Sequence, residues 1–62
     1  MKLLGKLNAS SLQTGDLIRI AGYVTKIVTI TVSGWKVNVE TEMFHAVEFH
    51  RSDKVSLFSK FD

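Results

Sequence analysis

The sequence predicts an all-β fold in which five short antiparallel strands close into a small barrel. Three observations support this prediction. Apolar and polar residues alternate with the period of a strand between Tyr23 and Val39. Clusters of Gly, Ser, Asn and Asp separate the remaining apolar segments at short intervals. No segment sustains the period of a long helix, and closure into a barrel removes the exposed edges that an open sheet would leave.

The longest alternating segment predicts a β-hairpin with its turn at Ser33-Gly34. A two-residue turn at this point places Val32 opposite Trp35 and directs every apolar side chain of the hairpin to the core face. A shift of one residue would turn Trp35 into water, so turn length and hydrophobic alternation predict the same register.

Shorter elements precede this hairpin. Leu17–Ile20 is predicted as a strand that ends in a bend at Ala21-Gly22, because glycine commonly marks a corner in a sheet. The following strand begins out of phase with the hairpin, which predicts a β-bulge near Thr25-Lys26. The segment from Leu3 to Leu12 fits either a strand or a helix, and its spacing does not decide between them.

A polar reversal follows the hairpin. A three-residue loop at Thr41–Met43 predicts a strand over Phe44–Phe49 with His45, Val47 and Phe49 facing inward. The same loop leaves Phe44 partly exposed, whereas a two-residue loop would reverse the two faces. A tight turn from residue 50 to residue 53 and a last strand from residue 55 to residue 58 complete the predicted barrel.

The inward positions define a thin core, because a single domain of 62 residues buries only about 60% of the surface that its unfolded chain exposes. The chain contains no cysteine, so neither a disulfide nor a thiolate metal site supports the fold. The predicted core residues are Ile18, Ile20, Val24, Ile27, Val28, Ile30, Val32, Trp35, Val37, Val39, Val47, Phe49, Val55 and Leu57.

A thin core and apolar residues near both ends of the chain predict self-association, with a homodimer as the expected state. Gly5 and Lys6 interrupt the apolar start of the chain before the core of a signal peptide forms, and no segment is long enough to span a bilayer. We therefore expect a cytoplasmic location and no membrane partner. The predicted protein interface consists of Leu3, Leu4, Phe58 and Phe61.

The segment from Thr14 to Ile20, followed by Gly22 and Val24, resembles the opening of SH3-like small barrels such as the KOW modules of transcription and ribosomal proteins. The short turn and last strand within residues 50–57 are also similar to that class, with an OB-like barrel as the alternative. The chain departs from the KOW pattern because it lacks the second glycine after the Gly22-x-Val24 segment. The resemblance implies a fold and not an activity.

The sequence predicts neither a catalytic site nor a metal or cofactor site. His45 and His50 are five residues apart, so in an unbroken strand they point to opposite faces and cannot share a ligand sphere. The chain also has no Gly-rich phosphate loop and no nucleophile in a strand-turn-helix frame. We therefore expect a binding module rather than an enzyme.

Nucleic acid is the first predicted ligand, because the net charge is +2 with a calculated pI near 9.2, and the outward positions combine cations with aromatic rings. The alternative is a protein-interaction module that acts as a small regulator or inhibitor of a larger enzyme, with an interface centred on Phe44, Phe58 and Phe61. Trp35 is assigned to the core rather than to base stacking. The predicted nucleic-acid-binding residues are Arg19, Lys26, Lys36 and Arg51 for phosphates, and Tyr23 and Phe44 for bases.

Overall fold

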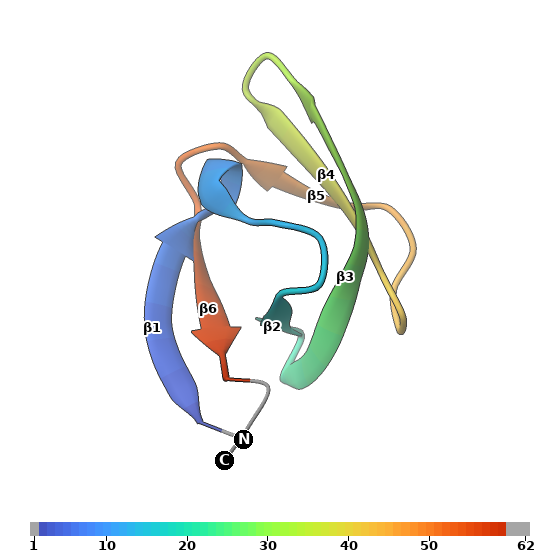
Figure 1. Ribbon diagram of the computed structural model, residues 1–62. Helices are drawn as coiled ribbons and strands as arrows, with labels where there is room; N and C mark the ends of the chain where they lie inside the picture. The colour runs from blue at the N-terminus through green and yellow to red at the C-terminus, as the bar shows by residue number, and fades with distance from the viewer. Residues whose placement is uncertain (1, 60–62) are drawn as a thin grey trace.

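The computed structural model describes residues 2–59, which form six β-strands and one short 3-10 helix (Figure 1). The all-β prediction is confirmed, and the sixth strand comes from the N-terminal segment that fitted either a strand or a helix. The elements are β1 (Leu3–Asn8), η1 (Ala9–Ser11), β2 (Leu17–Ile20), β3 (Tyr23–Ser33), β4 (Lys36–Thr41), β5 (Val47–His50) and β6 (Lys54–Phe58).

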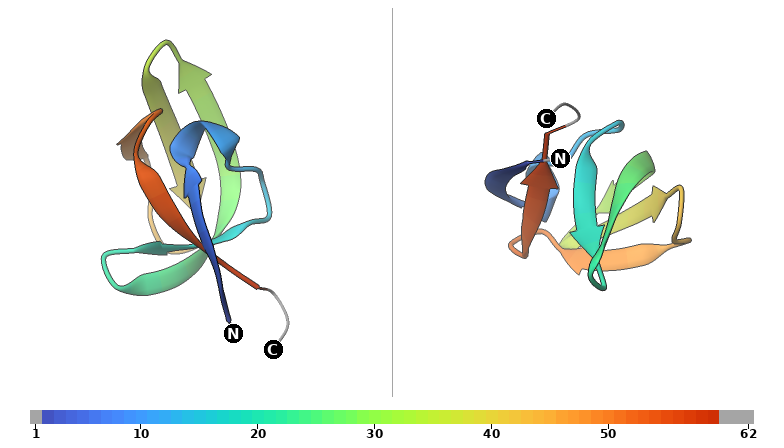
Figure 2. Two further views of the ribbon diagram at one scale, coloured as in Figure 1. Left: turned by 90° about the vertical axis from the view of Figure 1, so that its left-hand side faces the viewer. Right: turned by 90° about the horizontal axis from the view of Figure 1, so that it is seen from below.

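All pairings are antiparallel, and the strand order is β1-β6-β2-β3-β4-β5. The sheet bends strongly, but within residues 2–59 no ladder joins β1 to β5, so the predicted closure into a five-stranded barrel is wrong (Figure 2). β1 pairs with β6 from Lys54 to Phe58, and β2 pairs with β6 only at Leu57 and Phe58. The additional strand β1 therefore occupies an edge of β6 that the five-strand prediction had left free.

The long strand β3 joins two halves of the sheet. Residues 23–26 pair with β2, whereas Ile27 to Ser33 pair with β4. We call β1, β2, β6 and residues 23–26 the terminal half, and β4, β5 and residues 27–33 the hairpin half. The register shifts between Ile27 and Thr29, so the predicted bulge exists but is centred on Val28 rather than on Thr25-Lys26.

This bulge decides which side chains of β3 face the core. Before it, Thr25 and Ile27 point inward and are buried, and after it Ile30 takes over the inward position and is half-buried. Val28 is the additional residue and is 48% exposed, although the sequence predicted it in the core. A phase change at the bulge therefore moves one predicted core residue into solvent.

The hairpin turn lies one residue further along the chain than predicted. Ser33 pairs with Lys36 and Val32 with Val37, so the two turn residues are Gly34 and Trp35. Gly34 has φ +60°, and a type II′ turn requires glycine at the first of its two central positions, which places Gly34 first. The predicted register is therefore wrong, and Trp35 is half exposed in the turn instead of buried opposite Val32.

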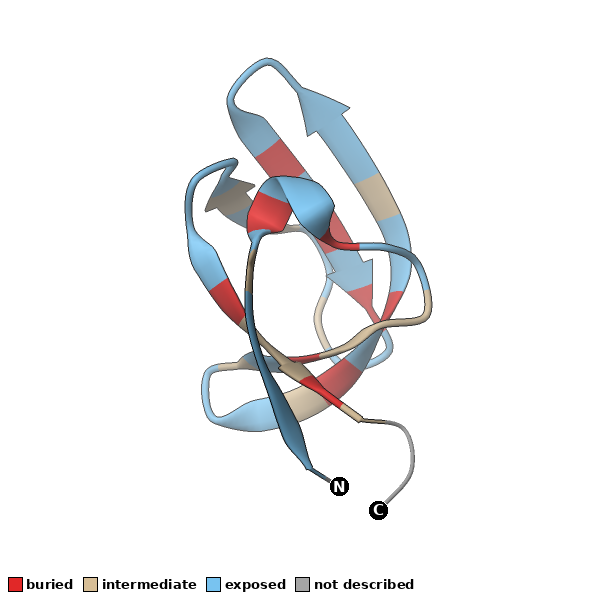
Figure 3. Ribbon diagram, turned by 60° about the vertical axis from the view of Figure 1, so that its left-hand side comes forward, coloured by how far each residue is buried: buried red, intermediate tan, exposed pale blue. Residues whose placement is uncertain are grey.

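The core lies between the two halves and is one continuous cluster (Figure 3). Ile18 and Val55 from the terminal half meet Val37 and Val39 from the hairpin half, with Ile27 at the junction. These predicted core residues are confirmed as buried, whereas Val28, Val32 and Trp35 are exposed. Four more predicted core residues are half-buried and pack against this cluster: Ile20, Ile30, Phe49 and Leu57. Val47 is half-buried opposite Val39. Val24 was predicted in the core, but it lies opposite Arg19 and points to the outer side, because its neighbour Thr25 takes the inward position opposite Ile18.

Two buried apolar residues, Ala9 and Leu12, come from the turn-rich segment that carries no strand period. They close one end of the core because η1 is fixed against the β5–β6 turn. The Ala9 N–H donates to the Asp53 carbonyl at 2.8 Å, and the Ser10 N–H donates to the Arg51 carbonyl at 3.4 Å. The predicted tight turn at residues 50–53 is confirmed, with the Asp53 N–H donating to the His50 carbonyl at 2.9 Å.

The connection between β4 and β5 contains five residues, Glu42 to Ala46, instead of the predicted three. Val47 and Phe49 face inward as predicted, opposite Val39 and Val37. His45 does not face inward as predicted, because it lies in the loop with its side chain 93% exposed, and β5 begins only at Val47. Phe44 is likewise in the loop, where it is half-buried.

Candidate nucleic-acid interface

Acidic and basic side chains are divided unequally between the two halves of the sheet. β1, β2, β3 and β6 contain no Asp or Glu, and both acidic residues that lie in strands, Glu40 and Glu48, belong to the hairpin half. The four strands without acidic residues each contribute one cation to the terminal half. These cations are Lys6 from β1, Arg19 from β2, Lys26 from β3 and Lys54 from β6, and we call them the basic face.

The pairing register places these four side chains on the outer side of the sheet. Val55 points into the core, so its neighbours on β6, Lys54 and Ser56, point outward. Lys6 lies opposite Ser56 and therefore points outward as well. On β2, Ile18 is fully buried, so Arg19 points outward, as does Lys26 opposite Leu17. All four cations are exposed.

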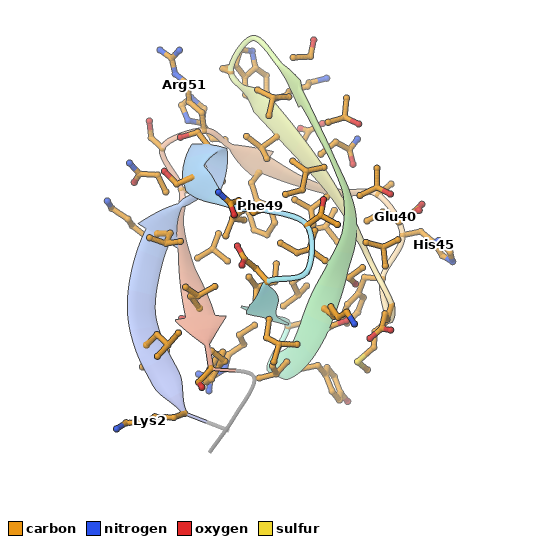
Figure 4. The ribbon with its side chains drawn as sticks, in the orientation of Figure 1. Lys2, Glu40, His45, Phe49 and Arg51 are labelled. Atoms are coloured by element: carbon orange, nitrogen blue, oxygen red, sulfur yellow. The ribbon has the colours of Figure 1, made fainter. Side chains whose placement is uncertain are left out.

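No carboxylate within residues 2–59 pairs with the basic face. The ion pairs of this region lie in or next to the hairpin half: Lys36 Nζ is 3.6 Å from Glu48 Oε1, and His45 Nδ1 is 3.8 Å from Glu40 Oε1 (Figure 4). Within residues 2–59, the cations of the basic face therefore have no ion-pair partner, whereas the charge of Lys36 is balanced by Glu48.

Arg19 is positioned by an aromatic ring beneath it. Phe58 lies opposite Leu17 on the outer side of β6, and its ring centroid is 4.9 Å from the Arg19 guanidinium carbon. Phe58 is only 8% exposed, so it supports Arg19 and offers little surface to a protein partner. Of the other predicted interface residues, Leu3 and Leu4 are exposed at 52% and 61%, and Phe61 lies outside the described residues.

A second group of candidate residues lies at the far end of the hairpin half. The Trp35 ring stacks on His50 with a centroid distance of 5.5 Å and an interplanar angle of 23°. Lys36 Nζ is 5.6 Å from the Trp35 ring centroid, and the Arg51 N–H donates to the Trp35 carbonyl at 2.8 Å. We call Trp35, Lys36, His50 and Arg51 the Trp35 cluster. Arg51 and Lys2 lie at opposite ends of the molecule in Figure 4.

Sequence reasoning included Lys36 and Arg51 among the binding residues but not Trp35 and His50. The missed signal is Gly34: a glycine that leads a type II′ turn forces the next residue, Trp35, out of the alternating pattern. Because the predicted register of the hairpin was wrong, the sequence did not place His50 next to Trp35.

Tyr23 and Phe44 form a third group. Their ring centroids are 6.3 Å apart at an angle of 52°. The loop that carries Phe44 is fixed by two buried threonines: the Met43 N–H donates to Thr25 Oγ1 at 3.2 Å, and the Phe44 N–H donates to Thr41 Oγ1 at 2.9 Å. Tyr23 is 57% exposed, so it is the more accessible ring of the pair.

The six predicted nucleic-acid-binding residues thus lie in three places rather than one. Arg19 and Lys26 belong to the basic face, Lys36 and Arg51 to the Trp35 cluster, and the two aromatic residues form the Tyr23–Phe44 pair. The basic face also includes Lys6 and Lys54, which the sequence did not single out because their strands could not be registered against each other.

Among residues 2–59, no group of three or more His, Asp or Glu side chains is arranged to hold a metal ion. The same residues contain no helix that is both long and apolar enough to cross a bilayer. No protein-family model, curated protein or solved structure shows a significant match to the chain.

Proposed function

We propose that this chain is a non-enzymatic nucleic-acid-binding module whose basic face contacts the phosphate backbone. The observation that carries the proposal is the presence of four exposed cations on one outer face of four neighbouring strands that contain no carboxylate. Lys and Arg side chains that neutralise phosphates release counterions, and this release is the main source of non-specific affinity for nucleic acid.

The proposal includes a relation to SH3-like barrels. Neighbouring strands pair from β2 to β5, and β2 also pairs with β6, so within residues 2–59 only a ladder between β5 and β6 is missing from a closed series of five strands. This arrangement supports a barrel-like core of five strands to which β1 is added as an edge. The bend of the sheet then presents the basic face on a convex surface.

The test is fluorescence anisotropy with labelled single- and double-stranded DNA and RNA at low and moderate salt. Four phosphate contacts predict that log K falls with log [salt] with a slope of about −3 for a single strand. The double variant Lys26→Gln/Lys54→Gln should reduce the size of this slope by about 1.4, because each lost contact removes about 0.7. Lys36→Gln is the matched control, since Glu48 already balances the charge of Lys36.

Three outcomes are informative. Binding with the expected salt slope that weakens in the double variant but not in Lys36→Gln supports the proposal. Equal weakening in both variants would show that the phosphate contacts are not concentrated on the basic face. Absence of binding to all four ligands at low salt would eliminate nucleic acid as the ligand.

A specific observation favours the second candidate, a protein-interaction module that acts as a small regulator or inhibitor of a larger enzyme. β1 is an edge strand whose only ladder within residues 2–59 is with β6, and it carries the exposed Leu3 and Leu4. An extended segment of a partner can add to such an edge through main-chain hydrogen bonds. Binding of this kind would depend weakly on salt and show a negative heat-capacity change.

A further inference from the structure

Trp35 exposes half of its surface although its indole ring already contacts two neighbours. His50 stacks on the ring with a centroid distance of 5.5 Å and an interplanar angle of 23°, and Lys36 Nζ lies over the ring at 5.6 Å from its centroid. Trp35 nevertheless remains 50% exposed. The structure therefore leaves half of an aromatic side chain of about the size of a nucleobase accessible to a ligand.

Hydrogen bonds from the neighbouring turn hold parts of this surface in place. The Arg51 N–H fixes the main chain of Trp35 at 2.8 Å, and the turn conformation of Gly34 fixes its direction. The His50 ring is fixed as well, because the Ser52 N–H donates to His50 Nδ1 at 3.1 Å.

Folding of the hairpin does not require a tryptophan at this position. The turn needs glycine at position 34, and the second turn position tolerates small polar residues. The core is closed without Trp35, since the buried cluster consists of other residues. Large exposed aromatic residues beside cations are typical of surfaces on which successive bases of a single strand stack.

We propose that Trp35, stacked on His50, is a base-stacking platform and that the ligand of this module is single-stranded nucleic acid. This inference rests on the proposed function, because the basic face supplies the phosphate contacts. The exposed Arg51 lies beside the platform and supplies the local phosphate contact, while Lys36 remains paired with Glu48. In a duplex each base is covered on both faces by its neighbours, so face-on stacking selects an unpaired strand.

The dimensions of the molecule allow one strand to contact both regions. The longest extent is 35 Å, and single-strand-binding modules of this class occupy about 4–16 nucleotides. An oligonucleotide of about twelve nucleotides is therefore a suitable probe.

The test uses Trp35 as its own reporter, because it is the only tryptophan in the chain. The intact protein is titrated with a twelve-nucleotide DNA strand of mixed sequence, an abasic strand of the same length, and the corresponding duplex. We expect the base-containing strand to quench the tryptophan fluorescence, and the abasic strand to bind more weakly without quenching. Duplex should bind more weakly than the single strand and should also leave the fluorescence unchanged.

Two substitutions separate stacking from folding. Trp35→Ala should weaken single-strand binding about tenfold in anisotropy, within the range of one lost base stack, and Trp35→Phe should retain most of the affinity. Lys26→Gln/Lys54→Gln should weaken binding but leave the quenching at saturation unchanged. Circular dichroism of each variant verifies that the fold is retained.

The possible failures are distinguishable. Salt-dependent binding without quenching, with Trp35→Ala equal to the wild type, would overturn the stacking platform and leave the proposed function intact. Tighter binding of duplex than of the single strand would also overturn the inference. Absence of any binding would remove both proposals.

Discussion

The terminal half and the hairpin half share one core but differ on their outer faces. Ile18 and Val55 of one half contact the same buried cluster as Val37 and Val39 of the other. Outside, the terminal half carries cations without carboxylates, while the hairpin half carries threonines and the Lys36–Glu48 pair. Strand propensity accounts for the threonines, but folding does not require four strands without a carboxylate. This difference between the outer faces is the basis of the proposed function.

The largest expected effect tests whether the two halves are one folding unit. Ile18→Ala in the terminal half should lower the free energy of unfolding by about 3 kcal/mol, because the side chain is fully buried. Val39→Ala in the hairpin half should cost about 2 kcal/mol for the same reason. Urea unfolding followed by circular dichroism and by Trp35 fluorescence measures both.

One cooperative transition should be seen by both probes in each variant. The control is Val32→Ala, which changes a residue that is 58% exposed and should cost less than about 0.5 kcal/mol. Two separate transitions, with one half unfolding first, would contradict the single shared core.

The second effect concerns the edge of the terminal half. We propose that two copies associate through their β1 strands, which would cover the exposed Leu3 and Leu4. Leu4→Lys should then weaken the dimer by about 2 kcal/mol, since two copies of the side chain lose apolar contact. Sedimentation equilibrium at micromolar concentration measures the change. Val32→Lys is the control, and a monomeric wild type would exclude the dimer.

The third effect is a contact between the halves. Thr25 lies in the terminal half of β3, and its Oγ1 accepts the N–H of Met43 in the loop that follows β4. Thr25→Val keeps the shape but leaves this N–H without its acceptor, which should cost about 1–2 kcal/mol. Thr31→Val, on the exposed outer face, should be close to neutral. Hydrogen exchange of the Met43 amide should accelerate in the first variant only.

Sequence reasoning predicted the strands and the main core positions because period-two alternation reports which residues face inward. Ile18, Ile27 and Val37 were found in this way. Sequence reasoning failed where a single residue shifts the alternation of inward and outward side chains. The bulge at Val28 and the turn led by Gly34 each exposed residues that alternation had placed in the core, and neither position is marked by alternation alone.

The candidate site was predictable only in part for a related reason. Arg19 was recognised as an outward cation because its side could be judged within its own strand, and Lys26 was named only as a phosphate contact. Lys6 and Lys54 join them only through the pairing of β1 with β6, two strands at opposite ends of the sequence. Single-strand patterns contain no information on such pairing, so the absence of carboxylates from this face became visible only in the folded sheet.

The smallest expected effect compares the two faces with one identical change. Asn8 lies opposite Lys54 in the terminal half, and Asn38 lies opposite Glu48 in the hairpin half; both are exposed. Asn8→Asp should stabilise the fold by about 0.5 kcal/mol through its new partner, whereas Asn38→Asp should destabilise it by a similar amount because it places like charges opposite each other. The effect on nucleic-acid affinity should not follow the effect on stability. Asn8→Asp, the stabilising change, should weaken binding several-fold at low salt by neutralising Lys54, and Asn38→Asp should weaken binding less. Urea denaturation and anisotropy on the same samples measure both quantities. If the two variants lose affinity equally, phosphate binding does not depend on the basic face, and the difference between the two halves has another cause.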